Sequence, residues 1–158
     1  MFKSLLVPID GSDYALKALE VASQMVAAEG MLYLLTVREL LPPLHEHGAM
    51  SVEAAIHAAS PEAAEKEGRA LLDKAGETIA AYPGEVQTLI RMGSPARVIV
   101  KEADRLGVDA IVMGSRGLSD ISGLIVGSVS HKVTHIANCM VISVHTKLDQ
   151  AALTDDES

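Results

Sequence analysis

Glycine and serine are concentrated in one stretch of the chain, residues 114–130, which reads GSRGLSDISGLIVGSVS. Glycine carries no Cβ, so Gly114 and Gly117 would let backbone amides approach a bound group closely. Gly127 and Ser128 stand where the pattern predicts that a helix begins. A helix N-terminus presents free N–H groups and the positive end of the helix dipole, and both favour a bound anion such as phosphate.

Side chains of the same stretch could complete this anion site, since Ser128 and Ser130 offer hydroxyl donors and Arg116 offers a cation. The chain has neither a Walker A sequence nor a G-x-G-x-x-G fingerprint, the two standard nucleotide-binding motifs. By its residues alone, the stretch fits either a phosphate-binding loop or a flexible surface loop that ends in a helix cap.

Histidine and cysteine are the other residues with chemical potential. His131 and His135 are four apart on a predicted helix and could share a metal ion, but Lys132 stands where a zinc-protease motif has glutamate. A solvated helix face is the preferred interpretation of this pair. Cys139 has no partner for a redox pair nearby in the sequence, so a buried, inert thiol is expected. We therefore predict no metal ligand and no catalytic residue.

The elements that must position these residues follow a regular alternation. Short apolar runs predict strands at 5–9, 31–37, 85–90, 110–113 and 140–144. Helical periodicity and capping residues predict helices at 12–29 (with Gly30 as terminator), 61–82, 94–107 and 128–137. Residues 38–60 interrupt this order as an irregular loop, with room for a turn of helix at 51–58. The alternation predicts an α/β fold, a single-domain open five-stranded parallel sheet with helices on both faces.

Ligands of such sheets bind beyond the carboxyl ends of the strands, where the strand order reverses. The two most polar strand exits are residues 10–12 after the first strand and residues 114–117 after the fourth. Both loops face one crevice if these strands are neighbours, and the sequence leaves that adjacency open. The third strand alternates polar and apolar residues, which is typical of an edge.

Several spaced motifs together resemble one known family. The spacing from Gly114 to Ser128, G-x2-G-x9-G-S, is similar to the ATP-binding signature of universal stress proteins, which have an adenine-nucleotide α-hydrolase-like fold. Further matches are VPIDGS at 7–12, GSP at 93–95, DAIVMGSRG at 109–117 and GSVS at 127–130. The resemblance spans residues 3–144. One departure is that Cys139 precedes methionine where the family commonly has Cys-Pro, and that position is structural.

The resemblance implies a site for ATP, with Mg²⁺ accompanying its phosphates. The residues that it implies are Pro8, Ile9 and Asp10 at the nucleoside, Val37 on the adenine, Met113 and Gly114 at the floor, and Arg116, Gly117, Gly127, Ser128, Val129 and Ser130 around the phosphates. Asp10 would accept hydrogen bonds from the ribose hydroxyls, a role that suits a lone carboxylate. A helix cap stays the alternative for Asp10, and ordinary strand-end packing the alternative for Val37.

Composition narrows the classes of function. The 158 residues are about the size of one domain, and we expect it over residues 1–146, followed by an acidic, disordered tail over 147–158. A net charge of −8 and the absence of Trp argue against nucleic-acid binding. The single cysteine cannot form an internal disulfide, and no apolar run is long enough for a membrane span. The chain is therefore expected in the cytoplasm, without a membrane partner.

The expected function is that of an ATP-binding universal stress protein, a nucleotide-dependent regulatory or protective module of the stress response with slow or no hydrolysis. One alternative is a slow ATPase or nucleotidyl transferase that uses the same pocket, and another is a nucleotide-free dimeric interaction protein. The resemblance also implies a homodimer in which the last strand, Met140 to Val144, pairs antiparallel with its copy. The alternative to the dimer is a monomer whose acidic tail covers that edge.

Overall fold

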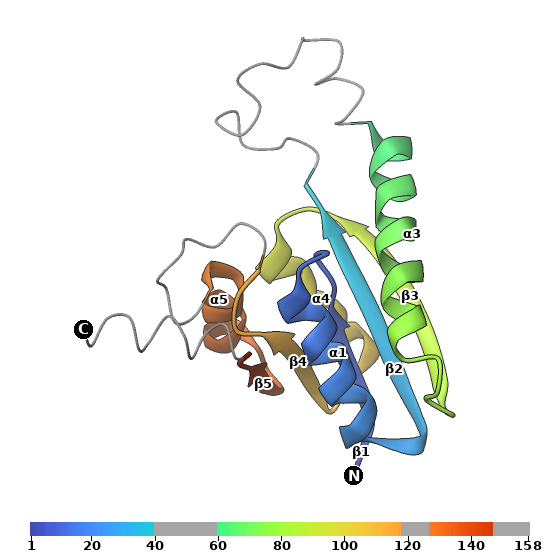
Figure 1. Ribbon diagram of the computed structural model, residues 1–158. Coiled ribbons are helices and arrows are strands. Elements are labelled where there is room, and N and C mark those ends of the chain that lie inside the picture. Colours follow the sequence, from blue (N-terminus) through green and yellow to red (C-terminus); the bar gives the residue numbers. More distant parts are fainter. Residues whose placement is uncertain (40–59, 118–126, 147–158) are drawn as a thin grey trace, which may run out of the picture.

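A five-stranded parallel sheet in the order β3-β2-β1-β4-β5 forms the centre of the computed structural model, which describes residues 1–39, 60–117 and 127–146 (Figure 1). The strands are β1 (Phe2–Pro8), β2 (Val26–Arg38), β3 (Glu85–Met92), β4 (Ala110–Gly114) and β5 (Met140–Val144). The helices are α1 (Asp13–Met25), α3 (Pro61–Thr78), α4 (Pro95–Leu106) and α5 (Ser128–Ile136). The predicted α/β class and the five-stranded sheet are confirmed, whereas the predicted tail and the turn of helix at 51–58 lie outside the described residues.

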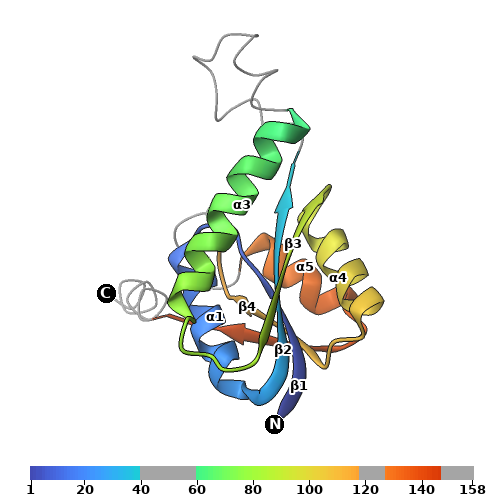
Figure 2. The ribbon, with the colours of Figure 1, turned by 90° about the vertical axis from the view of Figure 1, so that its right-hand side faces the viewer.

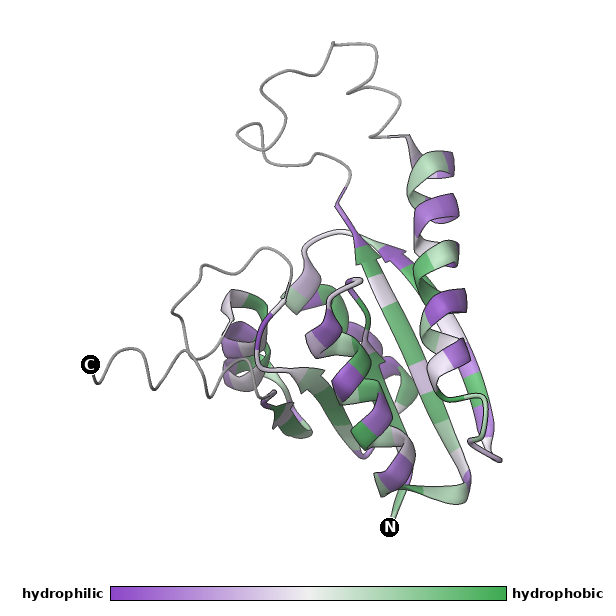
Figure 3. Ribbon diagram, viewed as in Figure 1, coloured by the Kyte–Doolittle hydropathy of each residue, from purple (hydrophilic) through white to green (hydrophobic). Residues whose placement is uncertain are grey.

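Helices cover both faces of the sheet, as the strand composition requires (Figure 2). Leu5 and Val7 of β1 are fully buried in one core with α1 and α3, and Leu6 is fully buried in a second core with α4 and α5. Successive side chains of a strand point to opposite faces, so a strand that is covered on both sides must be apolar throughout. In Figure 3 the central strands are accordingly almost wholly hydrophobic, while α3 carries hydrophilic bands.

The order of the strands reverses at β1, which pairs with β2 on one side and with β4 on the other. The chain thus winds outward from β1 to β3, then crosses back to β4 and β5. This is the adjacency that the sequence left open. It brings the exits of β1 and β4 together at one edge of the sheet. β3 and β5 form the two ends of the sheet, so the predicted edge position of the third strand is confirmed.

The start of β4 is tied directly to the start of β1. The Asp109 carboxylate accepts hydrogen bonds from the backbone N–H groups of Lys3 (2.7 Å) and Ser4 (3.1 Å), and Asp109 N–H donates to the Ser4 carbonyl (3.0 Å). The two N–H donors hold the pKa of the Asp109 carboxyl below its usual value. These bonds fix the two strands side by side at their amino ends, opposite the edge of the sheet where both strands exit.

The first helix ends earlier than its periodicity predicts. α1 stops at Met25, and β2 begins at Val26, which pairs with Phe2 and is buried in the core. The apolar spacing continues through Val26, but pairing with β1 buries this side chain without helix. We expected Gly30 to terminate the helix, and this prediction is wrong. It lies within β2, where a Cβ would sit 2.8 Å from the Lys3 carbonyl oxygen.

The second long helix is also shorter than predicted, ending at Thr78 instead of Tyr82. A turn follows, in which Tyr82 N–H donates to the Ile79 carbonyl (2.9 Å). The turn directs the Tyr82 hydroxyl to the carbonyl oxygens of Gly30 (2.8 Å) and Ala27 (3.0 Å), at the irregular start of β2. The hydrogen bonds of the Tyr82 hydroxyl thus take the place of the last predicted turn of the helix.

Candidate functional site

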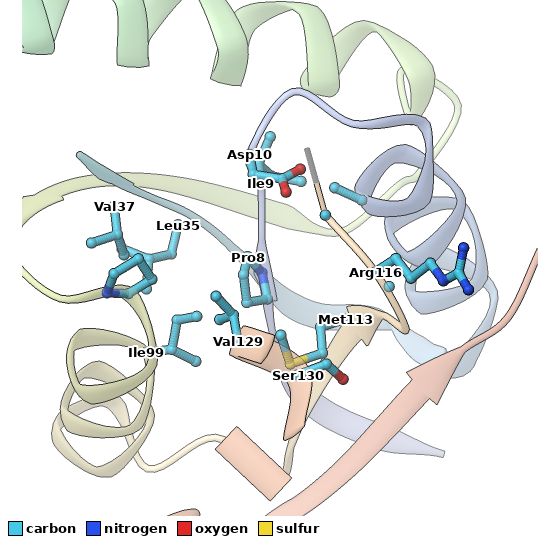
Figure 4. Close-up of a pocket in the computed structure, with 14 residues that line it drawn as sticks. Pro8, Ile9, Asp10, Leu35, Val37, Ile99, Met113, Arg116, Val129 and Ser130 are labelled. Carbon is cyan, nitrogen blue, oxygen red and sulfur yellow. The ribbon is translucent and has the colours of Figure 1, made fainter. Parts of the chain in front are cut away.

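A pocket lies beyond the carboxyl ends of the central strands, at the point where the strand order reverses (Figure 4). Ligands of open parallel sheets bind at this place. Its walls come from the ends of β1, β2 and β4 and from the first turns of three helices. The residues that line it are Pro8, Ile9, Asp10, Ala15, Leu35, Val37, Pro95, Ile99, Met113, Gly114, Arg116, Gly117, Val129 and Ser130.

Ten of the twelve residues that the sequence indicates for the site line this pocket, although they come from four separate parts of the chain. The other two, Gly127 and Ser128, do not line it. They form the N-cap and first residue of α5, directly before the lining residues Val129 and Ser130. The part of the predicted loop over 118–126 lies outside the described residues.

Four lining residues were not predicted from the sequence: Ala15, Leu35, Pro95 and Ile99. Pro95 belongs to the GSP motif at 93–95, so its position at a helix start was visible in the sequence. Ile99 follows one turn later on the same helix and is buried. Nothing local in the sequence indicates which helix face meets the strand ends, because that depends on how α4 sits on the sheet.

One side of the pocket is apolar. Figure 4 shows the side chains of Leu35, Val37 and Ile99 around this part, with Val129 and Met113 beside them. Val37 is half-buried at the end of β2, whereas Ile99 is almost fully buried. A wall of aliphatic side chains without charge suits a flat, weakly polar ring system.

Asp10 stands at the mouth of this apolar part, exposed and directly after the buried Ile9. One of its carboxylate oxygens accepts hydrogen bonds from the backbone N–H (2.9 Å) and the hydroxyl (2.5 Å) of Ser12. Ser12 is the actual N-cap of α1, since its Oγ accepts from Ala15 N–H at 3.2 Å. The alternative role of Asp10 as the helix cap is therefore wrong. Asp10 instead orients the cap residue.

Three helices begin at the pocket: Ala15 of α1, Pro95 of α4, and Val129 and Ser130 of α5 all lie in first turns. The positive ends of these three helix dipoles thus converge on one place. Their caps differ, because Ser12 bonds to the first turn of α1, whereas Gly127 gives α5 no capping side chain. Ser94 of α4 forms no side-chain cap hydrogen bond either, but Pro95 removes one N–H donor from that helix start, so the start of α5 offers more backbone donors to an anion.

A buried hydroxyl without a partner lies in this same first turn. Ser130 is 2% exposed, and within the part of the chain that the structure describes its Oγ has no hydrogen-bond partner. The Ser130 carbonyl, in contrast, accepts from the Thr134 hydroxyl at 2.8 Å. A buried hydroxyl that forms no hydrogen bond costs free energy, so its position at the pocket points to a polar ligand atom that would satisfy it.

Gly114, at the end of β4, has a packing role that the sequence did not indicate. A Cβ at this position would lie 2.7 Å from the Cβ of Tyr14 and 2.9 Å from its backbone carbonyl atoms. Glycine thus lets the end of β4 pass against the first turn of α1. This close approach holds two walls of the pocket together, whether or not a ligand also meets the Gly114 backbone.

Arg116 and Cys139 are the remaining side chains with chemical potential. Arg116 lines the pocket, but its guanidinium extends away from the apolar side chains in Figure 4. Burial raises the pKa of the Cys139 thiol, which lowers its thiolate fraction and supports an inert role.

Across residues 1–39, 60–117 and 127–146, no three His, Cys, Asp or Glu side chains are grouped to hold a metal ion. No helix within these ranges is long and apolar enough to cross a membrane.

The parallel sheet, its order reversal and the pocket at that reversal place the protein among the doubly wound α/β proteins. Residues 1–145 match the model of the universal stress protein family. The chain belongs to this family. It is 35% identical over 155 residues to the universal stress protein YxiE of Bacillus subtilis, an alignment that covers 91% of this chain and 99% of YxiE.

Solved structures give the same result. The hypothetical protein MJ0577 superposes with a TM-score of 0.76 at 26% identity, covering 92% of this chain and 97% of that one. A universal stress protein solved in complex with cAMP has a TM-score of 0.63, also at 26% identity, and the match covers 91% of this chain and 97% of that one. The predicted family and fold are thus confirmed.

Proposed function

We propose that this protein binds ATP in the pocket between β1 and β4 and acts as a nucleotide-dependent regulatory or protective module of the stress response. The observation that carries the proposal is the buried, unsatisfied Ser130 hydroxyl in the first turn of a helix that opens on an apolar pocket. An apolar wall together with an anion-seeking helix start suits a ligand that is aromatic at one end and anionic at the other. A nucleotide has this form.

Each part of the nucleotide has a proposed place in the pocket. The base would pack between Val37 and Ile99, and the ribose hydroxyls would donate to Asp10, whose carboxylate stands at the pocket mouth. The phosphates would meet the first turn of α5, where Ser130 Oγ gains a partner. Mg²⁺ would be held chiefly by the phosphates, since Asp10 is the one carboxylate among the described lining residues.

The same lining favours binding over turnover. Asp10 and Arg116 are the only ionisable side chains among the described residues that line the pocket, and in the proposed pose Asp10 binds the ribose hydroxyls and not the water that would attack a phosphate. A general base for hydrolysis would need a free acceptor within reach of the attacking water. The ATPase or nucleotidyl transferase alternative lacks such a group in this lining.

Asp10→Asn tests the nucleoside end of the site. We expect this variant to bind ATP at least about tenfold more weakly, because an amide replaces a charged acceptor of the ribose hydroxyls. Asp13→Asn is the matched control, since Asp13 is an exposed acid in the first turn of α1 and does not line the pocket. Calorimetric titration of nucleotide-free protein with ATP, AMP and cAMP measures both variants. Equal ATP affinity in Asp10→Asn and wild type would remove Asp10 from the site.

The rate of ATP turnover distinguishes the proposed binding module from the enzyme alternative. We expect bound ATP to persist for many minutes, and a steady-state rate of phosphate release far below about 1 per second, the low end of ordinary enzymes. A coupled phosphate-release assay with Mg²⁺ and saturating ATP measures this rate. Release at about 1 per second or faster would establish the enzyme alternative instead.

We also propose that two copies pair through β5, and that residues 1–146 form the nucleotide-binding domain of a cytoplasmic protein. β5 ends the sheet, and none of its five residues is fully buried, in contrast to β4, where all five are. Met140 (56% exposed) and Ile136 (46%) add apolar surface beside this edge. An apolar edge strand without proline pairs readily with another strand unless it is covered, and a two-fold contact with a second copy would cover it.

A further inference from the structure

Two histidines face each other on α5, outside the pocket. His131 and His135 are both exposed and one helical turn apart, and their Nε2 atoms share a hydrogen bond of 3.2 Å, whose proton a bound metal ion would replace. Their rings meet edge to face, with centroids 4.4 Å apart and planes at 87°. The sequence predicted a solvated face here, which their exposure agrees with. The convergence of the two Nε2 atoms is what the structure adds.

The distance between these nitrogens matches the bite of a metal ion. Zinc binds histidine nitrogen at about 2.0–2.1 Å in tetrahedral geometry, which sets two such ligands about 3.3 Å apart. We propose that His131 and His135 chelate a transition-metal dication of the Zn²⁺, Ni²⁺ or Cu²⁺ type through their Nε2 atoms. Imidazole is a ligand that these ions favour, whereas Mg²⁺ and Ca²⁺ prefer oxygen.

The backbone holds the pair in place. His131 N–H donates to the Gly127 carbonyl and Ala137 N–H donates to the Val133 carbonyl, both at 2.9 Å, so helical bonds enclose the turn. Val133, between the two histidines in sequence, is fully buried and anchors this turn to the second core. The Cα positions of both histidines would therefore be fixed before a metal ion binds.

Among the described residues, no neighbouring acid adds a third protein ligand to the two histidines. Within the described ranges neither histidine forms an ion pair, and no group of three potential ligands occurs. Asp104 of α4, which packs against α5, accepts a hydrogen bond from Asn138 Nδ2 at 3.0 Å. The remaining coordination positions are thus open to water or to a ligand from another molecule. Such a site is surface-exposed and lies outside the residues that line the pocket.

The test uses the full chain without nucleotide or Mg²⁺. Three other histidines, His45, His47 and His57, lie in the segment outside the described residues, so alanine replaces all three in a common background. Calorimetric titration with ZnCl₂ then measures His131→Ala, His135→Ala and the control His145→Ala in that background. Alanine favours an exposed helix, and circular dichroism checks that each variant folds.

We expect the background protein to bind one Zn²⁺ per chain. Either His131→Ala or His135→Ala should weaken this binding at least about tenfold, because each removes one of two ligands, whereas His145→Ala leaves it unchanged. Zn²⁺ should also raise the melting temperature of the background protein and not that of the two variants. Absence of Zn²⁺ binding in the background protein, or a Zn²⁺ affinity in either His131→Ala or His135→Ala equal to that of the background protein, would overturn the proposal.

Discussion

Gly127→Val is expected to bind ATP at least about a hundredfold more weakly than wild type while the protein stays folded. At α1 and α3 the N-cap serines reach over the first turn, where Ser12 and Ser60 each accept from an amide at 3.2 Å. A valine at Gly127, the N-cap of α5, would place its methyl groups over the corresponding amides. Hydrogen bonds to a charged group contribute about 1.5–3 kcal/mol each, so losing two corresponds to the stated factor.

The backbone itself accepts the substitution. Gly127 has φ −69° and ψ 160°, an ordinary extended conformation that any residue adopts, although the position is buried. Gly127→Ala should therefore give a smaller loss, and the three proteins form a graded series. Ser60→Val is the matched control, because it alters an N-cap that does not line the pocket and should cost stability without changing ATP affinity. Unchanged affinity in a folded Gly127→Val protein would place the phosphates elsewhere.

The fold was predictable where the local sequence pattern and the tertiary contacts favour the same structure. The last strand could be located to the residue from its apolar run, and α4 ends between the predicted cap residues because Pro95 fits a first turn and Gly107, with φ 63°, fits a helix end. The errors lie where tertiary contacts decide. Val26 continues the helical spacing of α1, and only its pairing with Phe2 assigns it to β2. No local signal carries that information.

The site was predictable in its loops and only partly in its walls. Asp10 and Gly117 stand at polar strand exits, where the sequence itself is unusual. Ile99 looks like any buried helix residue, and its place in the pocket depends on how α4 crosses the sheet. The neighbourhood of β1 and β4 also rests on contacts between residues more than a hundred positions apart, such as Ser4 and Asp109. Periodicity cannot reveal such pairings.

The β5 edge offers a sharp test of the proposed dimer. The Val144 carbonyl accepts from Ser115 N–H at 3.0 Å, so the backbone polar groups of Val144 face β4. Alternate residues of a strand direct these groups to opposite sides, so Ile142 also bonds to β4 while Ser143 points to the open edge. Ile142 and Ser143 are therefore different probes of the pairing. Proline at Ile142 would break the sheet, and proline at Ser143 would remove only an outward donor.

We therefore expect Ser143→Pro to be a folded monomer at tens of micromolar protein, where wild type is a dimer by light scattering. Ser143→Ala keeps the backbone N–H and should dimerise like wild type, which separates loss of the donor from loss of the hydroxyl. Ile142→Pro should lower the melting temperature much more than Ser143→Pro, because it removes a β4–β5 hydrogen bond within one chain. A monomeric wild type would refute the dimer. A Ser143→Pro protein that still dimerises would show that the two copies meet through another surface, because proline removes an outward donor of the proposed antiparallel ladder and its ring crowds the facing strand.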